Sequence, residues 1–307
     1  MARGSDAERT ARAFVCPAGA RRERIMIIPP VATAAVLGGA GLHAAWNVGI
    51  RGGADRRAST ALLVLAAGLI GAVLLPFLPV PAAGAWPHLA VSAVLHILYF
   101  NLVAEAYSLG TVSLAYPVMR GAAPALTAVI AALGFGERLG LAGWAGLLLI
   151  SLGVCLQARR SGAHGEARAL RFALANALIV ALYTVNDGIG TRLSHTPVAY
   201  SLWTFVLPAL PTALVLMRGR LGQLFTGDSV GSLLRRGVGG GACSVGSYTL
   251  ALWAMTQAPI GAIAALRETS MLFGVLFAWW FLAERPTRRR VLALSIIAIG
   301  AMILDIA

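Results

Sequence analysis

The sequence is poor in charged residues and contains no lysine. Only 12% of its 307 residues are charged, and 58% are hydrophobic, with a mean hydropathy of +0.79. A typical soluble domain has about 25% charged residues. The composition therefore excludes a water-soluble fold and predicts an integral membrane protein.

Cysteine is also scarce. Cys16, Cys155 and Cys243 have no metal-ligand spacing and no evident partners. The sequence has no paired His/Asp metal motif, no nucleophile with a base and no nucleotide-binding loop. Its longest hydrophilic connections, 159–169 and 218–235, are too short for a domain outside the membrane. We therefore expect no metal, no cofactor and no enzymatic centre.

All 25 basic residues are arginine, and they give a net charge of +13 and an isoelectric point near 11.2. In a soluble protein this charge would suggest nucleic-acid binding. Here the arginines cluster in short connections, namely Arg56-Arg57, Arg159-Arg160, Arg235-Arg236 and Arg288-Arg289-Arg290. This distribution is typical of anchoring beside anionic lipid headgroups, so we expect membrane lipid and no nucleic acid as a partner.

Residues 1–30 are predicted to form a basic, disordered N-terminal tail. Residues 1–25 contain six arginines, and their one apolar stretch, Ala13–Cys16, is too short for a signal-peptide core. Met26 stands directly before the first hydrophobic run, so a second hypothesis places the start of translation there. Detection of peptides from residues 1–25 by mass spectrometry would exclude it.

Ten apolar runs account for most of the remaining chain. A helix needs about 20 residues to cross a hydrocarbon core of about 30 Å. The runs cover residues 31–50, 59–80, 87–109, 111–134, 140–158, 170–192, 197–217, 236–256, 259–283 and 289–306. The third and fourth runs are almost contiguous, as are the eighth and ninth, so each pair predicts a tight antiparallel hairpin.

A shift of 147 residues places the ninth and tenth runs on the fourth and fifth without a gap. It matches Arg120 with Arg267, Glu137-Arg138 with Glu284-Arg285, and Gly153 with Gly300. The charged matches matter most, because arginine and glutamate are scarce in apolar helices.

The repeat divides the chain into a first five-helix repeat at 31–158, a basic linker at 159–169 and a second five-helix repeat at 170–307. Five crossings separate each helix from its counterpart. We therefore expect an all-α integral membrane fold of ten transmembrane helices in two inverted repeats, an arrangement that secondary transporters use.

Arg120 and Arg267 are predicted to lie near the bilayer centre. Arg120 lies about nine residues into its run, hence roughly 14 Å deep at about 1.5 Å per residue. Arginine at the centre of a spanning helix costs about 2.5–3.5 kcal/mol or more, so it should face the interior of the bundle. Both guanidinium groups are candidates to bind an anion. A buried ion pair with Glu268, Asp187 or Glu105 is the structural alternative.

Other polar residues within the spans are predicted to line one central cavity. Residues four apart share a helix face, as His43/Asn47 and Tyr183/Asp187 do. The predicted substrate-binding residues are His43, Trp46, Asn47, Tyr99, Asn101, Tyr116, Arg120, Tyr183, Asp187, Tyr248, Arg267 and Glu268. Glu105, Asp187 and Glu268 are the candidates to carry a coupling proton. Hydrogen bonding within the bundle is the alternative for the histidines, and interfacial anchoring for the tyrosines near helix ends.

The pairs Glu137-Arg138 and Glu284-Arg285 occur where helices leave the membrane. They are predicted to form interfacial turns without a binding role.

Several stretches resemble the EamA-type members of the drug/metabolite transporter superfamily. They are HAAWN (43–47), AYSLGTVSLAYPVMRG (106–121), GER (136–138), LWAMTQAP (252–259) and ALRETS (265–270). The resemblance extends from residue 31 onward. It implies ten helices in two inverted halves, a central pathway and the export of metabolites, amino acids or drugs. Thr111 is a departure, because many such proteins have an acidic residue there.

The sequence thus predicts a secondary transporter of the bacterial cytoplasmic (inner) membrane. It is expected to export a small polar or anionic metabolite, amino acid or drug by alternating access, as a monomer or homodimer. A lipid-linked-substrate flippase, an integral-membrane enzyme and a purely structural membrane subunit are the alternatives.

The orientation follows from charge. The connections after the first, fifth, seventh and ninth runs hold 15 arginines, against Arg138 and Arg192 on the other side. By the positive-inside rule this bias predicts that both termini lie outside, although family members are usually drawn with cytoplasmic termini.

Overall fold

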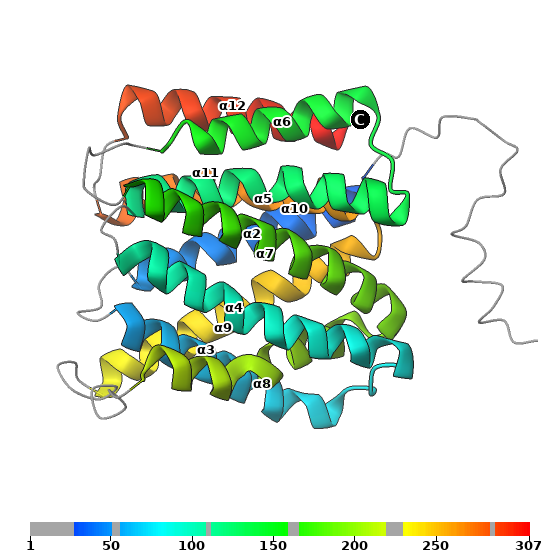
Figure 1. Ribbon diagram of the computed structural model, residues 1–307, viewed down its shortest axis with the longest axis vertical. Helices are drawn as coiled ribbons and strands as arrows, with labels where there is room; N and C mark the ends of the chain where they lie inside the picture. The colour runs from blue at the N-terminus through cyan, green and yellow to red at the C-terminus, as the bar shows by residue number, and fades with distance from the viewer. Residues whose placement is uncertain (1–27, 51–55, 109–111, 159–165, 219–229, 283–285) are drawn as a thin grey trace, which may run out of the picture.

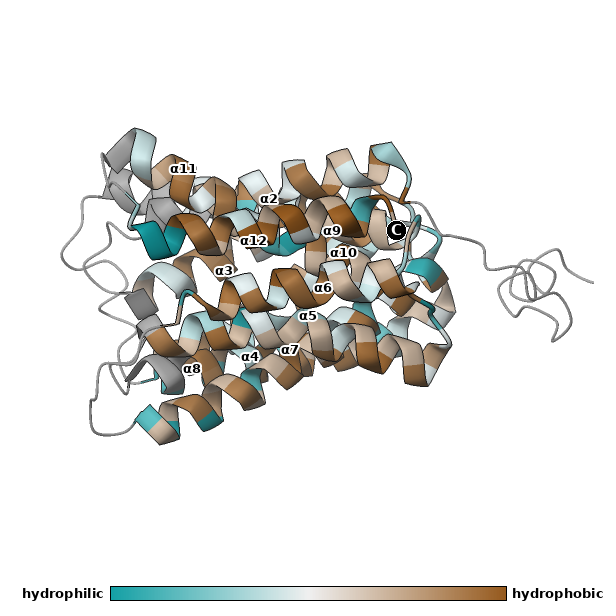
Figure 2. Cartoon of the chain, turned by 90° about the horizontal axis from the view of Figure 1, so that it is seen from above, coloured by the Kyte–Doolittle hydropathy of each residue, from teal (hydrophilic) through white to brown (hydrophobic). Residues whose placement is uncertain are grey.

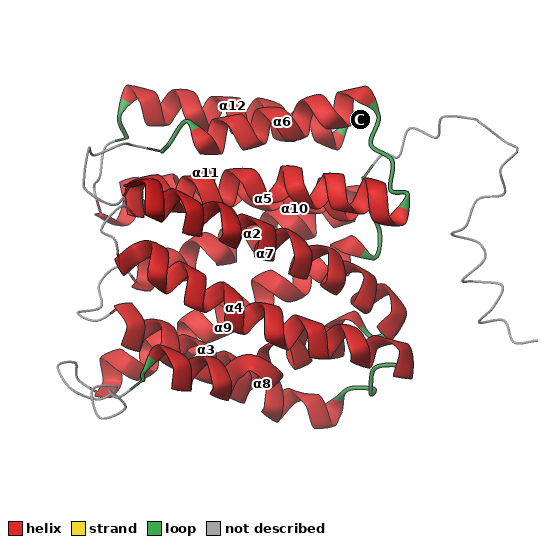
Figure 3. Ribbon diagram, viewed as in Figure 1, coloured by secondary structure: helices red, strands yellow, loops and turns green. Residues whose placement is uncertain are grey.

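The computed structural model describes residues 28–50, 56–108, 112–158, 166–218, 230–282 and 286–307. Within these residues the chain is helical with short connections and contains no strand (Figure 3). The helices lie side by side in one bundle (Figure 1). The predicted all-α fold is confirmed.

The helices of the two repeats follow the predicted runs closely. The first repeat contains α2 (Pro30–Ile50), α3 (Arg56–Leu74), α4 (Trp86–Ser108), α5 (Val112–Phe135) and α6 (Leu141–Cys155). The second contains α7 (Glu166–Ser194), α8 (Pro197–Leu216), α9 (Val230–Met255), α10 (Ile260–Leu266), α11 (Ser270–Leu282) and α12 (Arg288–Asp305). Short 3-10 helices occur at η1 (Leu75–Phe77), η2 (Ala83–Ala85) and η4 (Arg267–Thr269).

Six segments of the described chain are long and apolar enough to cross a membrane. They are Ala58–Phe77, Ala83–Val103, Leu114–Phe135, Glu166–Ser194, Pro197–Leu216 and Ile260–Trp280, and Pro30–Ala45 and Leu141–Cys155 are shorter apolar helices. α12 begins with three arginines, which lower its hydropathy. Hydrophobic residues line most of each helix, and several helix ends are hydrophilic (Figure 2). The chain is a multi-pass membrane protein, and the count of ten crossings stays a prediction.

The contact between α6 and α12 reflects the internal repeat. A Cβ atom at Gly146 would lie 2.7 Å from the Gly300 carbonyl oxygen, and one at Gly153 would lie 2.8 Å from the Ala293 carbonyl oxygen. Residue numbers rise along one helix and fall along the other, so the two helices are antiparallel. The 147-residue shift matches Gly153 with Gly300 and Gly146 with Ala293. The two contacts are therefore one contact seen from either repeat.

Other helix pairs show the same relationship. α2 packs on α9 as its counterpart α7 packs on α4, and α5 packs on α7 as α11 packs on α2. α3 packs on its own counterpart, α8. Each pair joins one helix from each repeat. The repeats therefore interlock in a single bundle, and residues from both can meet in its interior.

The ninth predicted run, 259–283, contains one candidate span, and the structure divides its helix in two. α10 ends at Leu266, η4 forms one 3-10 turn, and α11 begins at Ser270. All residues of α10 are buried. A 3-10 helix turns about 120° per residue instead of about 100°, so η4 changes the direction in which successive side chains point.

Candidate functional site

Arg120 of α5 forms an ion pair with Glu268 of η4. The Arg120 Nε atom lies 3.0 Å from Glu268 Oε2, and Arg120 Nη2 donates a hydrogen bond to Ser270 Oγ at 3.2 Å. The Glu268 side chain is only 6% exposed and that of Arg120 18%. Nε and Oε2 are within ion-pair distance but are not aligned for a hydrogen bond. Glu268 neutralises Arg120 inside the bundle. This is the buried ion pair predicted from the sequence as the alternative to anion binding by Arg120.

Arg267 has a different environment. Its guanidinium carbon lies over the face of the Tyr248 ring, 5.2 Å from the ring centroid. Among the described residues, no carboxylate lies within ion-pair distance of Arg267. The repeat gives the reason, because the 147-residue shift matches Glu268 with Gly121. The carboxylate that pairs with Arg120 thus has no counterpart for Arg267.

Asp187 of α7 is completely buried and is held by neutral donors. The Tyr200 hydroxyl donates to its Oδ1 at 3.1 Å, and the Tyr248 hydroxyl donates to its Oδ2 at 2.6 Å. Asn186 Nδ2 also donates to Oδ1, at 3.2 Å. A length of 2.6 Å is typical of a hydroxyl bonded to a charged oxygen. The geometry therefore fits an ionised Asp187.

Aromatic rings pack beside Asp187. His96 of α4 stacks on Tyr183 with ring centroids 4.5 Å apart, and it meets Tyr248 edge-on at 6.0 Å. Tyr99 meets Tyr183 edge-on at 5.9 Å. His96 Nδ1 lies 2.9 Å from the Ser92 carbonyl oxygen, which fixes the ring. These rings give the polar interior apolar walls.

The elements that carry these residues pack on one another. α2 contacts α9 and η4, α7 contacts α4, α5 and α9, and α8 contacts α4. Residues of α2, α4, α5, α7, α8, α9 and η4 therefore meet in one place. We call this set the central polar cluster, and it consists of His43, His96, Tyr99, Arg120, Tyr183, Asp187, Tyr200, Tyr248, Arg267 and Glu268.

Two other predicted residues lie near this cluster. Tyr116 is half-buried on α5, one turn before Arg120, and packs with Met119 and Ala173. Asn101 donates its side-chain amide to the Ile97 carbonyl oxygen of its own helix at 2.9 Å. Its role in binding stays a prediction.

Glu105 differs from the other two proton candidates. It is exposed in the last turn of α4, whereas Asp187 and Glu268 are buried. The side chains of Trp46 and Asn47 lie outside the described residues, as does the predicted turn at Glu284-Arg285.

Arg192 and Glu137 join four chain segments in an arrangement that the sequence did not reveal. Arg192 donates from Nη1 to Glu137 Oε1 at 2.8 Å, and to the carbonyl oxygens of Met255 and Ala258 at 2.8 and 2.9 Å. The Ile260 backbone N–H donates to Glu137 Oε2 at 2.8 Å, so Glu137 caps the N-terminus of α10. These five residues are the end cluster, and they tie α5, α7, α9 and α10 together at one end of the bundle.

A left-handed glycine positions Glu137. Gly136 has φ +67°, and the Glu137 N–H donates to the Ala131 carbonyl oxygen at 3.2 Å, which ends α5. The sequence predicts an interfacial turn here but gives no sign that Arg192 would reach it. Tyr200 was also missed, because a tyrosine in the first turn of a spanning helix has the pattern of an interfacial anchor.

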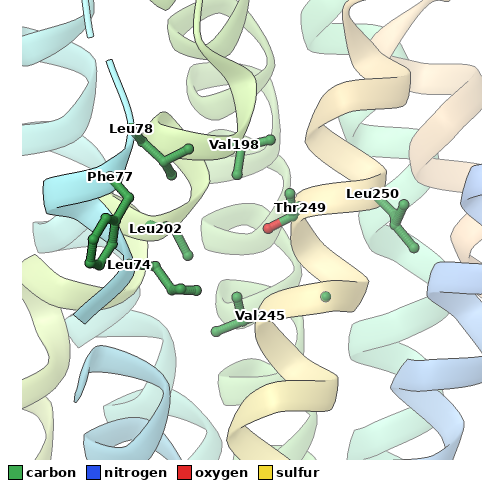
Figure 4. A pocket seen from close by; sticks show the side chains of 9 residues that line it. Leu74, Phe77, Leu78, Val198, Leu202, Val245, Thr249 and Leu250 are labelled. Carbon is green, nitrogen blue, oxygen red and sulfur yellow. The ribbon is translucent and has the colours of Figure 1, made fainter. Parts of the chain in front are cut away.

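A surface groove of about 500 Å³ lies between α3, α8 and α9 (Figure 4). It is lined by Leu74, Phe77, Leu78, Val198, Leu202, Val245, Gly246, Thr249 and Leu250. Thr249 is the one polar side chain in this lining, and its hydroxyl donates to Ser201 Oγ. None of the predicted substrate-binding residues lines the groove, whose apolar walls fit hydrocarbon.

These features define a class of protein, a multi-pass helical membrane protein with a charged and aromatic interior built from two repeats. In the described part of the chain, no three metal-binding side chains come together. The EamA-like transporter family model matches residues 31–159 and 167–304. The chain therefore belongs to the EamA-like transporter family and is a transporter, not an enzyme. The family model thus matches the chain twice, once in each half.

Solved structures show the same fold. Twenty-nine of their chains match this one. One crystal structure, described only as that of a protein, is 21% identical and superposes with a TM-score of 0.72, covering 89% of this chain and 95% of its own. A search of curated proteins found no match.

Proposed function

We propose that this chain is a secondary transporter of a small anion in the bacterial cytoplasmic membrane, with Arg267 as the residue that binds the anion. The observation that supports this proposal is a guanidinium inside the bundle with a ring face, and no carboxylate, beside it in the described structure. A guanidinium presents paired donors that match carboxylate and phosphate oxygens. A bound anion would give Arg267 the neutralising negative charge that Glu268 gives Arg120.

The walls of the central polar cluster indicate what else the substrate should contain. Tyr99, Tyr183 and His96 offer ring faces and edges, which suit an organic body attached to the anionic group. The substrate class that fits is a small organic acid, including amino acids and phosphorylated metabolites. Export is the direction that the family resemblance implies.

Alternating access is supported by the symmetry of the fold and by the end cluster. α6 and α12 match each other in the repeat and run antiparallel, as inverted repeats require. The end cluster joins four segments on one side of the bundle, so access from that side requires the Glu137–Arg192 contact to separate. We propose that this contact is the gate on the side where the termini lie, and that this side faces out of the cell.

The groove does not favour the flippase alternative. A flippase must accommodate a polar headgroup, whereas all but one of the residues that line the groove are apolar or glycine.

Flux measurements on purified protein in proteoliposomes test the proposal. The panel pairs each anion with a neutral counterpart of similar shape, such as benzoate with benzamide and lactate with lactamide, and adds inorganic phosphate. We expect flux above that of protein-free liposomes for at least one anion and for no neutral counterpart, and loss of that flux in Arg267→Gln. Equal flux of an anion and its amide, or undiminished flux in a folded Arg267→Gln protein, would refute the role of Arg267.

A further inference from the structure

The Tyr248 side chain touches two charged groups of the central polar cluster, Asp187 and Arg267. Its hydroxyl donates to Asp187 Oδ2 at 2.6 Å, while its ring face lies 5.2 Å from the Arg267 guanidinium carbon. We propose that Tyr248 couples anion binding at Arg267 to proton binding at Asp187. This inference rests on the proposed function in one respect, namely that Arg267 receives the anion.

The surroundings of Tyr248 make such coupling physically direct. The residue is buried, and Phe205 and His96 meet its ring edge-on at 5.9 and 6.0 Å. The hydroxyl and the ring face belong to one rigid group. A displacement of this group changes both contacts at once, which links the occupancy of the two partners.

The sign of the coupling follows from the charges. The Arg267 cation attracts the electrons of the ring and makes the hydroxyl a stronger donor, which stabilises ionised Asp187. An anion on Arg267 cancels that charge, so Asp187 then binds a proton more readily. By reciprocity, a proton on Asp187 strengthens anion binding. An anion and a proton that bind together cross the membrane in the same direction.

Other groups face Asp187, but among the described residues Tyr248 alone combines a hydrogen bond to Asp187 with a ring contact to Arg267. α4 contributes His96 and Ser92, α8 contributes Tyr200, and α7 itself contributes Tyr183 and Asn186. From α5, Arg120 acts on Tyr183, and Tyr116 acts on Tyr99. α10 and η2 have no titratable side chain. Tyr183 lies near both charges but has no hydrogen bond to Asp187 in the described structure, so Tyr248 is the direct contact between the two sites.

Tyr200 provides a matched control. It donates to the same carboxylate at 3.1 Å and is also buried, but no cation lies on its ring in the described part of the chain. Tyr200→Phe and Tyr248→Phe each remove one hydroxyl from Asp187. Only Tyr248→Phe removes the link to Arg267.

The test measures protonation of Asp187 directly, by infrared spectroscopy of the protein in lipid nanodiscs. The carboxylic acid band that disappears in Asp187→Asn is titrated against pH. We expect Arg267→Gln to raise the protonation midpoint by about one pH unit, a tenfold effect within the typical range for coupled sites. In the Tyr248→Phe background this shift should vanish. In the Tyr200→Phe background the midpoint itself should change, but Arg267→Gln should still shift it. An equal shift in both backgrounds, or no shift at all, would overturn the proposal.

A second substitution covers the case in which Tyr248→Phe does not fold. Incorporation of 3-fluorotyrosine at position 248 keeps the shape and makes the hydroxyl a stronger donor. The Asp187 midpoint should then fall, and the effect of Arg267→Gln on it should persist. An unchanged midpoint would contradict the proposed link.

A transport measurement separates this inference from the proposed function. With benzoate and inorganic phosphate as probes, a pH dye in proteoliposomes should show proton movement with the anion, and a lower proton-to-anion ratio in Tyr248→Phe. If the infrared shift occurs but no anion of the panel moves, the proposed function fails and the coupling stands. If anions move but Arg267→Gln leaves the midpoint unchanged, the coupling fails and the function stands.

Discussion

Arg120 and Arg267 occupy the same position in the two repeats, yet only Arg120 has a carboxylate partner in the described structure. That partner, Glu268, corresponds to Gly121 in the first repeat. A Cβ atom at Gly121 would lie 2.6 Å from the Cys155 sulfur, so the packing of α5 on α6 leaves no room for a glutamate. The two repeats therefore share one fold, but Arg120 is neutralised by a carboxylate and Arg267 is available to an anion.

Loss of Glu268 alone should be worse than loss of both members of its ion pair. Glu268→Gln leaves the Arg120 charge without compensation, and breaking a buried pair from one side costs about 3–5 kcal/mol. The double variant Glu268→Gln/Arg120→Gln removes both charges and should recover part of that loss. Thermal unfolding in detergent measures the difference. Additive losses would show that the two residues do not interact.

Arg267 should matter for binding more than for stability. Arg267→Gln removes charge-assisted hydrogen bonds, which contribute about 1.5–3 kcal/mol each, and should weaken binding of a transported anion by about tenfold or more. Arg267→Lys keeps the charge without the paired donors and should be intermediate. Calorimetric titration in nanodiscs measures the affinity.

Arg289 offers the control for this measurement. It donates to the Leu156 and Ala158 carbonyl oxygens at 2.9 and 2.8 Å and does not belong to the central polar cluster. Arg289→Gln changes the net charge by the same amount and should leave the affinity unchanged. Equal losses in the two variants would point to a general effect of charge.

The end cluster should control access from its side of the bundle. Glu137→Gln removes a charge-assisted contact with Arg192, so the closed arrangement should lose about 1.5–3 kcal/mol of stabilisation. Ala258 is only 6% exposed there, and a cysteine at that position reports opening. In a background without Cys16, Cys155 and Cys243, a membrane-impermeant maleimide should label Ala258→Cys about tenfold faster when Glu137→Gln is added. Unchanged labelling would show that the contact does not hold the gate.

The helix pattern and the matched arginines could be predicted from the sequence, because both depend on local features. Apolar run length sets where a helix can cross a bilayer, and rare charges make a weak repeat detectable. The division of the chain into repeats at 31–158 and 170–307 follows from these features alone. The family model also matches two segments, 31–159 and 167–304.

The pairing within the site depends on how the repeats interlock, which no local pattern contains. The sequence offered Glu268, Asp187 and Glu105 as partners and did not show which arginine each would meet. η4 contains neither glycine nor proline, so the sequence carries no sign of the break between α10 and α11. At this break the Arg267 and Glu268 side chains point in different directions. The acceptors of Arg192 are largely backbone carbonyls, which every residue possesses and no sequence motif reveals.

The glycines between α6 and α12 provide a test of the repeat symmetry itself. A Cβ atom at Gly300 would lie 2.7 Å from the Gly146 carbonyl oxygen and 2.9 Å from the Ile150 nitrogen, and one at Gly153 would meet Ala293 and Ile297 as closely. Because backbone atoms cannot move aside cheaply, Gly300→Ala and Gly153→Ala should each cost about 1–3 kcal/mol. Gly239→Ala in α9 meets nothing within 4 Å and should be neutral or stabilising by about 0.5–1 kcal/mol. Thermal unfolding of the three variants checks this. Since Gly153 and Gly300 make the same contact from opposite repeats, their losses should be similar. A large loss at one and none at the other would contradict the symmetric packing of these two helices.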